Sequence, residues 1–335
     1  MKKSPHYKIK SMEGKSVLVL GGLGFIGSNT AHRCCELGAE VAVFDAMLEP
    51  YGFNMENLEG IRERVKFVKA DMRDFSALAE EVKGKGIIFN CAGQVSHVDS
   101  MENPMLDMEL NIGANINLLE ACRKYNDKAT VVYAGTRGEF GRALYLPMDE
   151  KHPADPVDVY GINKLAAEKY HLLYASTYGI KACSLRLTNT YGERHQMKHA
   201  KYGIMNWFIR LALEGKEIPL YGGGKMLRDY LYVRDVADAM VMAAQEGKCA
   251  GKFYSLGNGK GIRFVEIVKK IIKEAGSGSW RNVEFPPERK RIEIGDMYFS
   301  HRMFSRDTGW KPSTGLDEGI ERTISFYRER LGKYT

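Results

Sequence analysis

Tyr160 and Lys164 are the two residues whose types and spacing most directly suggest chemistry. They stand four positions apart in a segment with helical periodicity, so their side chains project from one face of a predicted helix. A lysine ammonium can lower the pKa of a neighbouring phenol, and the resulting phenolate can accept a proton from a hydroxyl. Many pairs at this spacing are only exposed helix pairs, so the prediction of a catalytic pair depends on other residues.

Thr136 supports the catalytic interpretation because it lies just beyond the apolar run 129–134, a predicted strand. In a parallel sheet the carboxyl ends of the strands form the edge where ligands bind. The Thr136 hydroxyl could share a hydrogen bond with the substrate oxygen that Tyr160 deprotonates. The alternative is a loop hydroxyl that caps backbone groups.

A glycine pattern, Gly21, Gly24 and Gly27, joins a predicted strand to a predicted helix. The first glycine permits a tight turn, and the second lets backbone N–H groups approach a pyrophosphate. The third lets the helix pack closely on the strand. The positive end of the helix then faces the phosphates. The pattern therefore predicts a dinucleotide-binding turn.

Asp45 ends the second predicted strand, 18 residues after Gly27. Its carboxylate can accept hydrogen bonds from adenosine ribose hydroxyls and would repel a 2′-phosphate, so NAD is predicted rather than NADP. Asp71, just past the third predicted strand, is a candidate adenine contact, or else a turn or helix-cap residue before Ser76. The small residues at 91–93 follow the fourth predicted strand and let the backbone lie against a cofactor.

The elements that must position these residues alternate along the first half of the chain. Apolar runs of strand length occupy 16–20, 40–45, 65–69, 86–90, 129–134 and 181–187, and longer amphipathic segments occupy 26–37, 107–125 and 159–178. Buried strands separated by helices predict an α/β fold, a Rossmann-type doubly wound parallel sheet.

The regular alternation of strand-like and helix-like segments ends at about residue 189. A polar loop at 192–202 precedes helix-like segments at 204–214, 236–245, 264–275 and 316–331, and strand-like segments at 228–233 and 251–256. We therefore predict an NAD-binding domain at 13–189, with segments near 229–256 returning to it. A smaller C-terminal α/β lobe at 190–331 is expected to bind the substrate.

The composition indicates a water-soluble cytoplasmic protein. Hydrophobic residues make up 44% and charged residues 27% of the 335 positions, and we find neither a membrane-length apolar run nor a signal-peptide core. None of the six cysteines forms a C-x-x-C pair, which favours free thiols over disulfides or a zinc site; no metal is predicted. The net charge of +7 comes without a dense basic run interleaved with aromatics, so an anionic small molecule is favoured over nucleic acid or a membrane.

Together these residues resemble the extended short-chain dehydrogenase/reductase family, within it the NAD-dependent nucleotide-sugar epimerases and dehydratases of the UDP-glucose 4-epimerase type. The similarity spans residues 15–330. Its matching stretches are 21–27, Asp45, 90–93, Asn111, Thr136, 160–164, 185–192, 228–233 and 309–312.

The resemblance implies roles for individual residues. The catalytic set would be Thr136, Tyr160 and Lys164. The residues predicted to contact the cofactor are Gly21, Gly24, Phe25, Ile26, Gly27, Asp45, Asp71, Met72, Ala92, Gly93, Tyr160 and Lys164. Those predicted to contact the substrate are Gln94, Asn189, Arg228 and Arg291.

In that set the two arginines would clasp the diphosphate, since guanidinium groups bind phosphate oxygens bidentately. The alternatives are a surface ion pair for Arg228 and a solvated charge for Arg291. The resemblance also implies a homodimer formed through the helices at 107–125 and 159–178.

The resemblance implies a shared opening step, in which a base takes the proton from the C4 hydroxyl of the sugar while NAD takes the hydride from C4. The 4,6-dehydratases usually carry Asp-Glu directly after the catalytic threonine, where this chain has Arg137 and Gly138; Glu139 stands one residue further on. We therefore expect an isomerase, an NAD-dependent 4-epimerase of a UDP-hexose or UDP-N-acetylhexosamine. Phe140 replaces a usual tyrosine, which leaves the sugar and the inverted carbon open. The alternatives are a dehydratase or decarboxylase of the same family and a non-catalytic NAD-binding regulator.

Overall fold

A seven-stranded, fully parallel sheet forms the centre of the protein. The computed structural model describes residues 7–285 and 293–335. The strand order is β11-β6-β5-β4-β1-β2-β3, and every adjacent pair runs parallel. The strands are β1(Ser16–Leu20), β2(Glu40–Asp45), β3(Val65–Lys69), β4(Ile87–Asn90), β5(Thr130–Thr136), β6(Lys181–Leu187) and β11(Phe253–Leu256). The predicted doubly wound sheet is thus confirmed.

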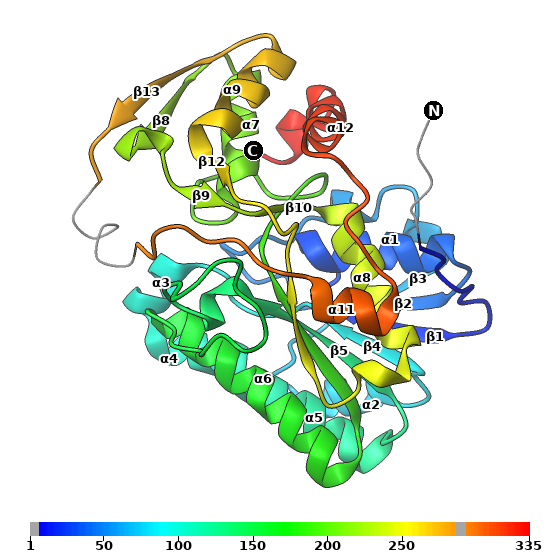
Figure 1. Cartoon of the computed structure of the whole chain (residues 1–335). Coiled ribbons are helices and arrows are strands. Elements are labelled where there is room, and N and C mark those ends of the chain that lie inside the picture. The colour runs from blue at the N-terminus through cyan, green and yellow to red at the C-terminus, as the bar shows by residue number, and fades with distance from the viewer. Residues whose placement is uncertain (1–6, 286–292) are drawn as a thin grey trace.

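Helices cover both faces of the sheet, as Figure 1 shows. One core cluster joins one sheet face to α1(Phe25–Glu36), α8(Val233–Gln245) and α11(Arg302–Thr308). The other joins the opposite face to α2(Phe75–Val82), α5(Ala114–Tyr125) and α6(Val159–Tyr178). Strands buried from both sides need apolar residues at nearly every position, as in the central strands β1 and β4, whereas the edge strand β3 alternates with lysines and is only partly buried.

A second, upper lobe lies over the carboxyl edge of the sheet (Figure 1). Its apolar core is formed mainly by α7(Ile204–Leu213), α9(Phe264–Ala275) and α12(Leu316–Arg328). Three short two-stranded sheets accompany these helices: β10(Tyr230–Tyr232) with β7(Asn189–Tyr191), β12(Ile262–Arg263) with β9(Leu227–Arg228), and β13(Ser279–Val283) with β8(Glu217–Tyr221).

The chain crosses between the lobe and the sheet more than once. After the lobe begins, α8 packs on α1 and β11 pairs with β6, before α9 returns to the lobe. The expected return of the chain near 229–256 therefore occurs. The domain limits of 13–189 and 190–331 stay a prediction.

Two predicted elements are interrupted. The segment 107–125 is not one continuous α-helix, because the π-helical turn η3(Glu109–Gly113) separates α4(Pro104–Met108) from α5. The segment 228–233 is not one strand either, since β9 and β10 are separated at Asp229 and pair with different partners. The buried Asp229 carboxylate accepts hydrogen bonds from the Asn258 and Phe299 N–H groups, which fixes the break.

The remaining elements are short. They are α3(His97–Glu102) and the single turns η1(Met55–Leu58), η2(Arg62–Arg64), η4(Arg137–Glu139), η5(Gly222–Gly224), η6(Gly247–Cys249) and η7(Leu331–Lys333). Within the described residues, no helix has both the length and the apolar character needed to cross a bilayer. The cytoplasmic location stays a prediction.

Candidate active site

The glycine turn between β1 and α1 leaves no room for side chains. A Cβ at Gly27 would lie 2.2 Å from the Gly21 carbonyl oxygen, and one at Gly21 would lie 2.8 Å from the Ala92 backbone. Gly21 also has a φ of 69°, which favours glycine. No side chain caps α1, which begins just after Gly24, so its first N–H groups remain available to an anion. This turn therefore fits a dinucleotide pyrophosphate.

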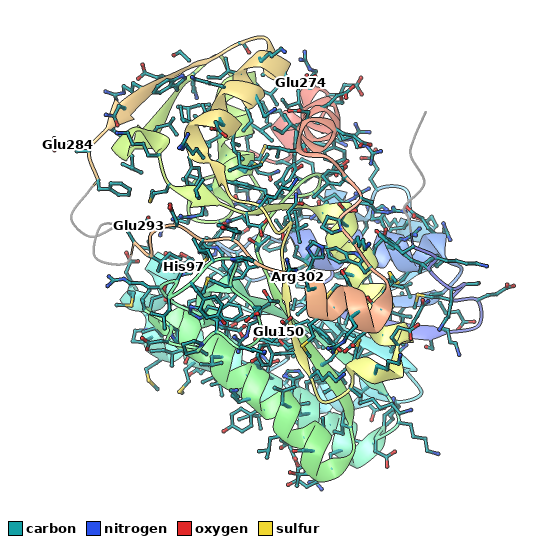
Figure 2. The ribbon with its side chains drawn as sticks, viewed as in Figure 1. His97, Glu150, Glu274, Glu284, Glu293 and Arg302 are labelled. Carbon is teal, nitrogen blue, oxygen red and sulfur yellow. The ribbon has the colours of Figure 1, made fainter. Side chains whose placement is uncertain are left out.

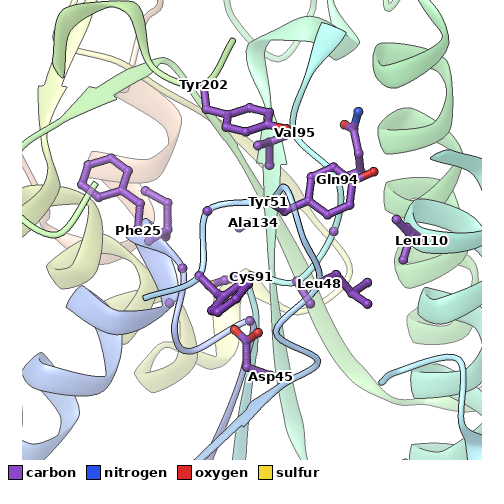
Figure 3. Close-up of a pocket in the computed structure, with 18 of the residues that line it drawn as sticks. Phe25, Asp45, Leu48, Tyr51, Cys91, Gln94, Val95, Leu110, Ala134 and Tyr202 are labelled. Carbon is purple, nitrogen blue, oxygen red and sulfur yellow. The ribbon is translucent and has the colours of Figure 1, made fainter. Parts of the chain in front are cut away.

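A cavity of about 330 Å³ opens above this turn. Figure 3 shows its wall, with Asp45 below Cys91 and with Phe25 and Leu110 on opposite sides. The structure brings every residue predicted to contact the cofactor to its lining: Gly21, Gly24, Phe25, Ile26, Gly27, Asp45, Asp71, Met72, Ala92, Gly93, Tyr160 and Lys164.

The two acidic residues of this cavity are held by different contacts. Asp45 is buried, and its carboxylate accepts hydrogen bonds from the Leu23 and Met47 N–H groups at 3.0 and 2.9 Å. These bonds orient the carboxylate at the end of β2. Asp71 forms an ion pair with Arg73 at 2.7 Å and lies in a turn, whereas the N-cap of α2 is Asp74. Of the alternative given for Asp71, a turn or helix-cap residue, the turn is confirmed and the helix cap is wrong.

The three predicted catalytic residues, Thr136, Tyr160 and Lys164, line the same cavity. Thr136 ends β5, and Tyr160 and Lys164 lie in the first turns of α6, which Asp158 caps by accepting from the Gly161 N–H. Tyr160 and Thr136 are joined through a side-chain hydrogen bond. The Lys164 ammonium donates to the Ala134 carbonyl at 2.8 Å and lies 4.1 Å from the centre of the Tyr133 ring.

The pKa of the Tyr160 phenol differs from the prediction. Burial raises the pKa of Tyr160 above its usual value, and the largest opposing influences are the Thr136 hydrogen bond and the Arg137 charge. The prediction that Lys164 produces a low phenol pKa is therefore wrong for this arrangement, because desolvation of the phenolate outweighs the nearby cations. Burial also lowers the pKa of Lys164.

Glu139 lies behind the catalytic set rather than in it. Its Oε1 accepts from the Thr136 N–H at 2.8 Å, and its Oε2 lies 3.0 Å from Arg186 Nε. Arg186 also donates to Glu168 at 2.6 Å, and all three side chains are buried. Burial and the neighbouring Glu168 carboxylate raise the pKa of Glu139, which favours its neutral acid. Glu139 is thus committed to internal contacts and does not line either of the two cavities described here.

A second cavity, of about 500 Å³, lies between the sheet and the upper lobe. Thr136 and Tyr160 line both cavities, so a group in one can meet a group in the other at these side chains. Asn189 and Arg228 line the second cavity, as expected for substrate contacts. Figure 2 shows His97 and Glu293, two further lining residues, at the boundary between the sheet and the lobe.

The outcome is different for Gln94 and Arg291, the other two predicted substrate contacts. Gln94 lines the first cavity only, and its amide is engaged by the backbone of Ser96, so its placement favours the cofactor side. Arg291 lies outside the described residues. Arg228 is buried and forms an ion pair with Glu293 at 2.6 Å, which corrects the alternative of a surface ion pair.

Several polar residues of the second cavity were not predicted, and Arg137 and His97 are the two nearest the catalytic set in sequence or by contact. Arg137 lines the second cavity and donates to Asn189 Oδ1 at 3.1 Å. His97 hydrogen-bonds Asp158 through Nδ1 at 2.5 Å, and its ring packs edge-on against Tyr160 with centroids 4.9 Å apart. The position of Arg137 next to Thr136 was a usable signal. No sequence spacing links Asp158 to His97.

Comparison with known proteins decides the family. The model for the NAD-dependent epimerase/dehydratase family matches residues 17–257, most of the chain. The chain belongs to this family. It therefore uses NAD, and the geometry of the first cavity fits that cofactor.

Relatives within the family catalyse different reactions. The UDP-glucose 4-epimerase of Mycolicibacterium smegmatis is 30% identical over 318 residues, 93% of this chain and 98% of that protein. The dTDP-glucose 4,6-dehydratase of Xanthomonas campestris is 28% identical over 335 residues, 92% of each chain. The solved structure of Thermus thermophilus UDP-glucose 4-epimerase with NAD is 31% identical, covers 94% of this chain and 99% of its own, and gives a TM-score of 0.84. The family is thus one of nucleotide-sugar enzymes, and the individual reaction needs a separate argument.

Proposed function

We propose that this protein is an NAD-dependent 4-epimerase of a UDP-linked hexose. One observation carries the proposal: Thr136 and Tyr160 line both the dinucleotide cavity and the cavity below the upper lobe. A sugar in the second cavity would place a hydroxyl against these two side chains. The similarity to UDP-glucose 4-epimerases over nearly the whole chain supports the choice of a UDP-sugar.

In the proposed reaction Thr136 and Tyr160 act on the C4 hydroxyl of the sugar. The bound cofactor supplies a reversible hydride acceptor at its nicotinamide ring. Tyr160 accepts the hydroxyl proton, with Thr136 sharing the hydrogen bond, and later returns a proton to the same oxygen. Lys164 is oriented by the Ala134 carbonyl and the Tyr133 ring, and its ammonium can bind ribose hydroxyls.

The first oxidation gives a 4-keto sugar. Turning this intermediate within the second cavity would present its other face before the hydride returns, and C4 would then be inverted. Asn189 and Arg228 line that cavity and are suited to hold the diphosphate during the turn. Arg228 is already paired with Glu293, so a phosphate would have to share its guanidinium donors.

The residues that follow Thr136 along the chain argue against a 4,6-dehydratase. Elimination of the C6 hydroxyl needs an acid that reaches the sugar, and positions 137 and 138 are arginine and glycine. Glu139, the acidic residue next along the chain, accepts from the Thr136 N–H and contacts Arg186 instead. This arrangement supports epimerisation over elimination.

We also propose a homodimer formed through α5 and α6 and the segment before them. Large apolar side chains are exposed on these elements: Met105 in α4 and Ile162 and Leu173 in α6, with exposed fractions of 61%, 52% and 51%. Burial of such side chains against a second copy would remove them from water.

A screen of UDP-, dTDP-, CDP- and GDP-hexoses with product identification by NMR and mass spectrometry tests the proposed reaction. Conversion of a UDP-hexose to its C4 epimer at unchanged mass is expected. Loss of water or carbon dioxide would instead identify a dehydratase or decarboxylase. Tight NAD binding without any change in a nucleotide sugar would favour a non-catalytic regulator.

A further inference from the structure

Among the described residues, Arg137 is the one charged side chain lining the second cavity that forms no ion pair. Two other cations line this cavity, and each pairs with a carboxylate: Lys201 with Asp99 at 2.5 Å and Arg228 with Glu293 at 2.6 Å. The His97 imidazole, which also lines the cavity, hydrogen-bonds the Asp158 carboxylate at 2.5 Å. Within residues 7–285 and 293–335, Arg137 forms no ion pair. Its Nε donates to the neutral amide oxygen of Asn189, and one NH group approaches the sulfur of Met297 at 3.9 Å.

This position is unfavourable for a guanidinium without an anion. Burial and the neighbouring Arg228 charge lower the pKa of Arg137, because both disfavour a charged group there. A guanidinium carries five N–H donors in a planar fork, and the contacts above use few of them. The cavity is therefore suited to an anionic oxygen pair brought by the ligand.

Two parts of a UDP-sugar could supply such oxygens. The diphosphate is one, and Arg228 and Asn189, the residues proposed to bind it, also line the cavity. The other is a carboxylate at C6 of the sugar, which is carried by C5, the neighbour of the reacting carbon. Arg137 directly follows Thr136 and lines the same cavity as Thr136 and Tyr160, so it lies beside the catalytic set where C4 must sit.

We propose that Arg137 binds the C6 carboxylate of the sugar, so that the preferred substrate is a UDP-linked uronic acid rather than a neutral hexose. This inference rests on the proposed function, because it places C4 at Thr136 and Tyr160. Arg137 is then a specificity-determining residue: its paired N–H groups match a carboxylate and gain less from the hydroxymethyl group of a neutral sugar.

Equilibrium binding to the NAD-loaded protein tests the inference without depending on turnover. Dissociation constants for UDP-glucuronate and UDP-glucose are measured by calorimetry for the unmodified protein and for Arg137→Gln, Arg137→Lys and Arg142→Gln. Arg142 is an exposed arginine on the same loop and lines neither cavity, which makes it the matched control. The NAD content of each variant reports whether it folds.

The unmodified protein is expected to bind UDP-glucuronate about tenfold or more tightly than UDP-glucose, as a charge-assisted hydrogen-bond pair would produce. Arg137→Gln should abolish this preference while leaving UDP-glucose binding within about threefold, which is less than one such bond contributes. Arg137→Lys should keep part of the preference, and Arg142→Gln all of it. Equal loss of both ligands in Arg137→Gln would assign Arg137 to the diphosphate and overturn the inference, as would equal binding by the unmodified protein. Binding with the expected preference but without epimerisation would contradict only the proposed reaction.

Discussion

Glu139 Oε1 accepts a hydrogen bond from the Thr136 backbone N–H at 2.8 Å, while the Thr136 hydroxyl accepts from the Gly138 N–H at 3.2 Å. These two bonds form a capping box around the turn that carries the catalytic threonine. The orientation of Thr136 therefore depends on a buried acid that does not line the substrate cavity.

Replacing Glu139 separates this positioning role from a direct one. Glu139→Gln keeps an acceptor for the Thr136 N–H and should retain most activity. Glu139→Ala removes it and should lower kcat about tenfold or more with a small change in KM, because a misplaced hydroxyl weakens the reaction more than binding. Steady-state kinetics with the UDP-sugar substrate give both values. Normal kcat in the alanine variant would rule out the positioning role, and equal loss in the glutamine variant would point to a need for its proton.

Asp45 is expected to set the choice of cofactor. Asp45→Ala removes the carboxylate from the end of β2, and should weaken NAD binding about tenfold while reducing the discrimination against NADP. Dissociation constants for both dinucleotides check this. Asp45→Asn serves as the control for the Leu23 and Met47 hydrogen bonds, since its amide oxygen can keep one of them. Tighter NADP than NAD binding by the unmodified protein would contradict the assignment.

Buried histidines should make the protein sensitive to mild acid. Burial lowers the pKa of His171 from 6.5 to about 4, and its Nε2 has no partner in the described structure. Between these values the unfolded chain binds more protons than the folded protein, so stability is full above about pH 6.5 and falls as the pH drops toward 4. The shift corresponds to at most about 3 kcal/mol.

Urea unfolding at several pH values between about 7 and 4 checks the effect. This range spans the titration of a histidine in the unfolded chain, whose pKa is about 6.5. His171→Gln, which does not titrate, should show a shallower loss of stability than the unmodified protein. Burial lowers the pKa of His32 and His195 to about 4 as well, so part of the acid sensitivity should remain. An unchanged pH dependence in His171→Gln would show that this residue is not responsible.

Disrupting the exposed apolar side of α6 should dissociate the proposed dimer. Leu173→Glu places a charge where burial against a second copy is expected, and sedimentation velocity should then show a monomer. Leu144→Glu is the matched control, because Leu144 is 74% exposed and lies in the loop after η4. A monomeric unmodified protein, or a Leu173→Glu variant that sediments as a dimer, would rule out this interface.

The sheet and the glycine turn of the cofactor cavity could be predicted from the sequence because both depend on local patterns. Continuous apolar runs predict buried parallel strands, and the glycines at 21, 24 and 27 are needed at contacts within a single strand–turn–helix unit. The residues that follow strand ends, Asp45 and Thr136, come together because parallel strands share one carboxyl edge.

The remaining features depend on contacts between distant segments. Glu139, Glu168 and Arg186 are brought together by η4, α6 and β6, and their separate sequence contexts give no sign of a shared buried cluster. The raised pKa of Tyr160 arises from burial beneath neighbouring elements, whereas the Tyr-x-x-x-Lys spacing reports only the proximity of a charge. The break at Asp229 likewise needs the distant Asn258 and Phe299 N–H groups.

The most direct measurement of the central claim uses a UDP-sugar substrate carrying deuterium at C4. If Tyr160 moves the hydroxyl proton while C4 hydride is removed and returned within the site, the C4 epimer should retain its deuterium in ordinary water. Tyr160→Phe should then lower kcat about a hundredfold or more, with NAD still bound. Loss of the deuterium to solvent, or unchanged inversion by Tyr160→Phe, would contradict the mechanism.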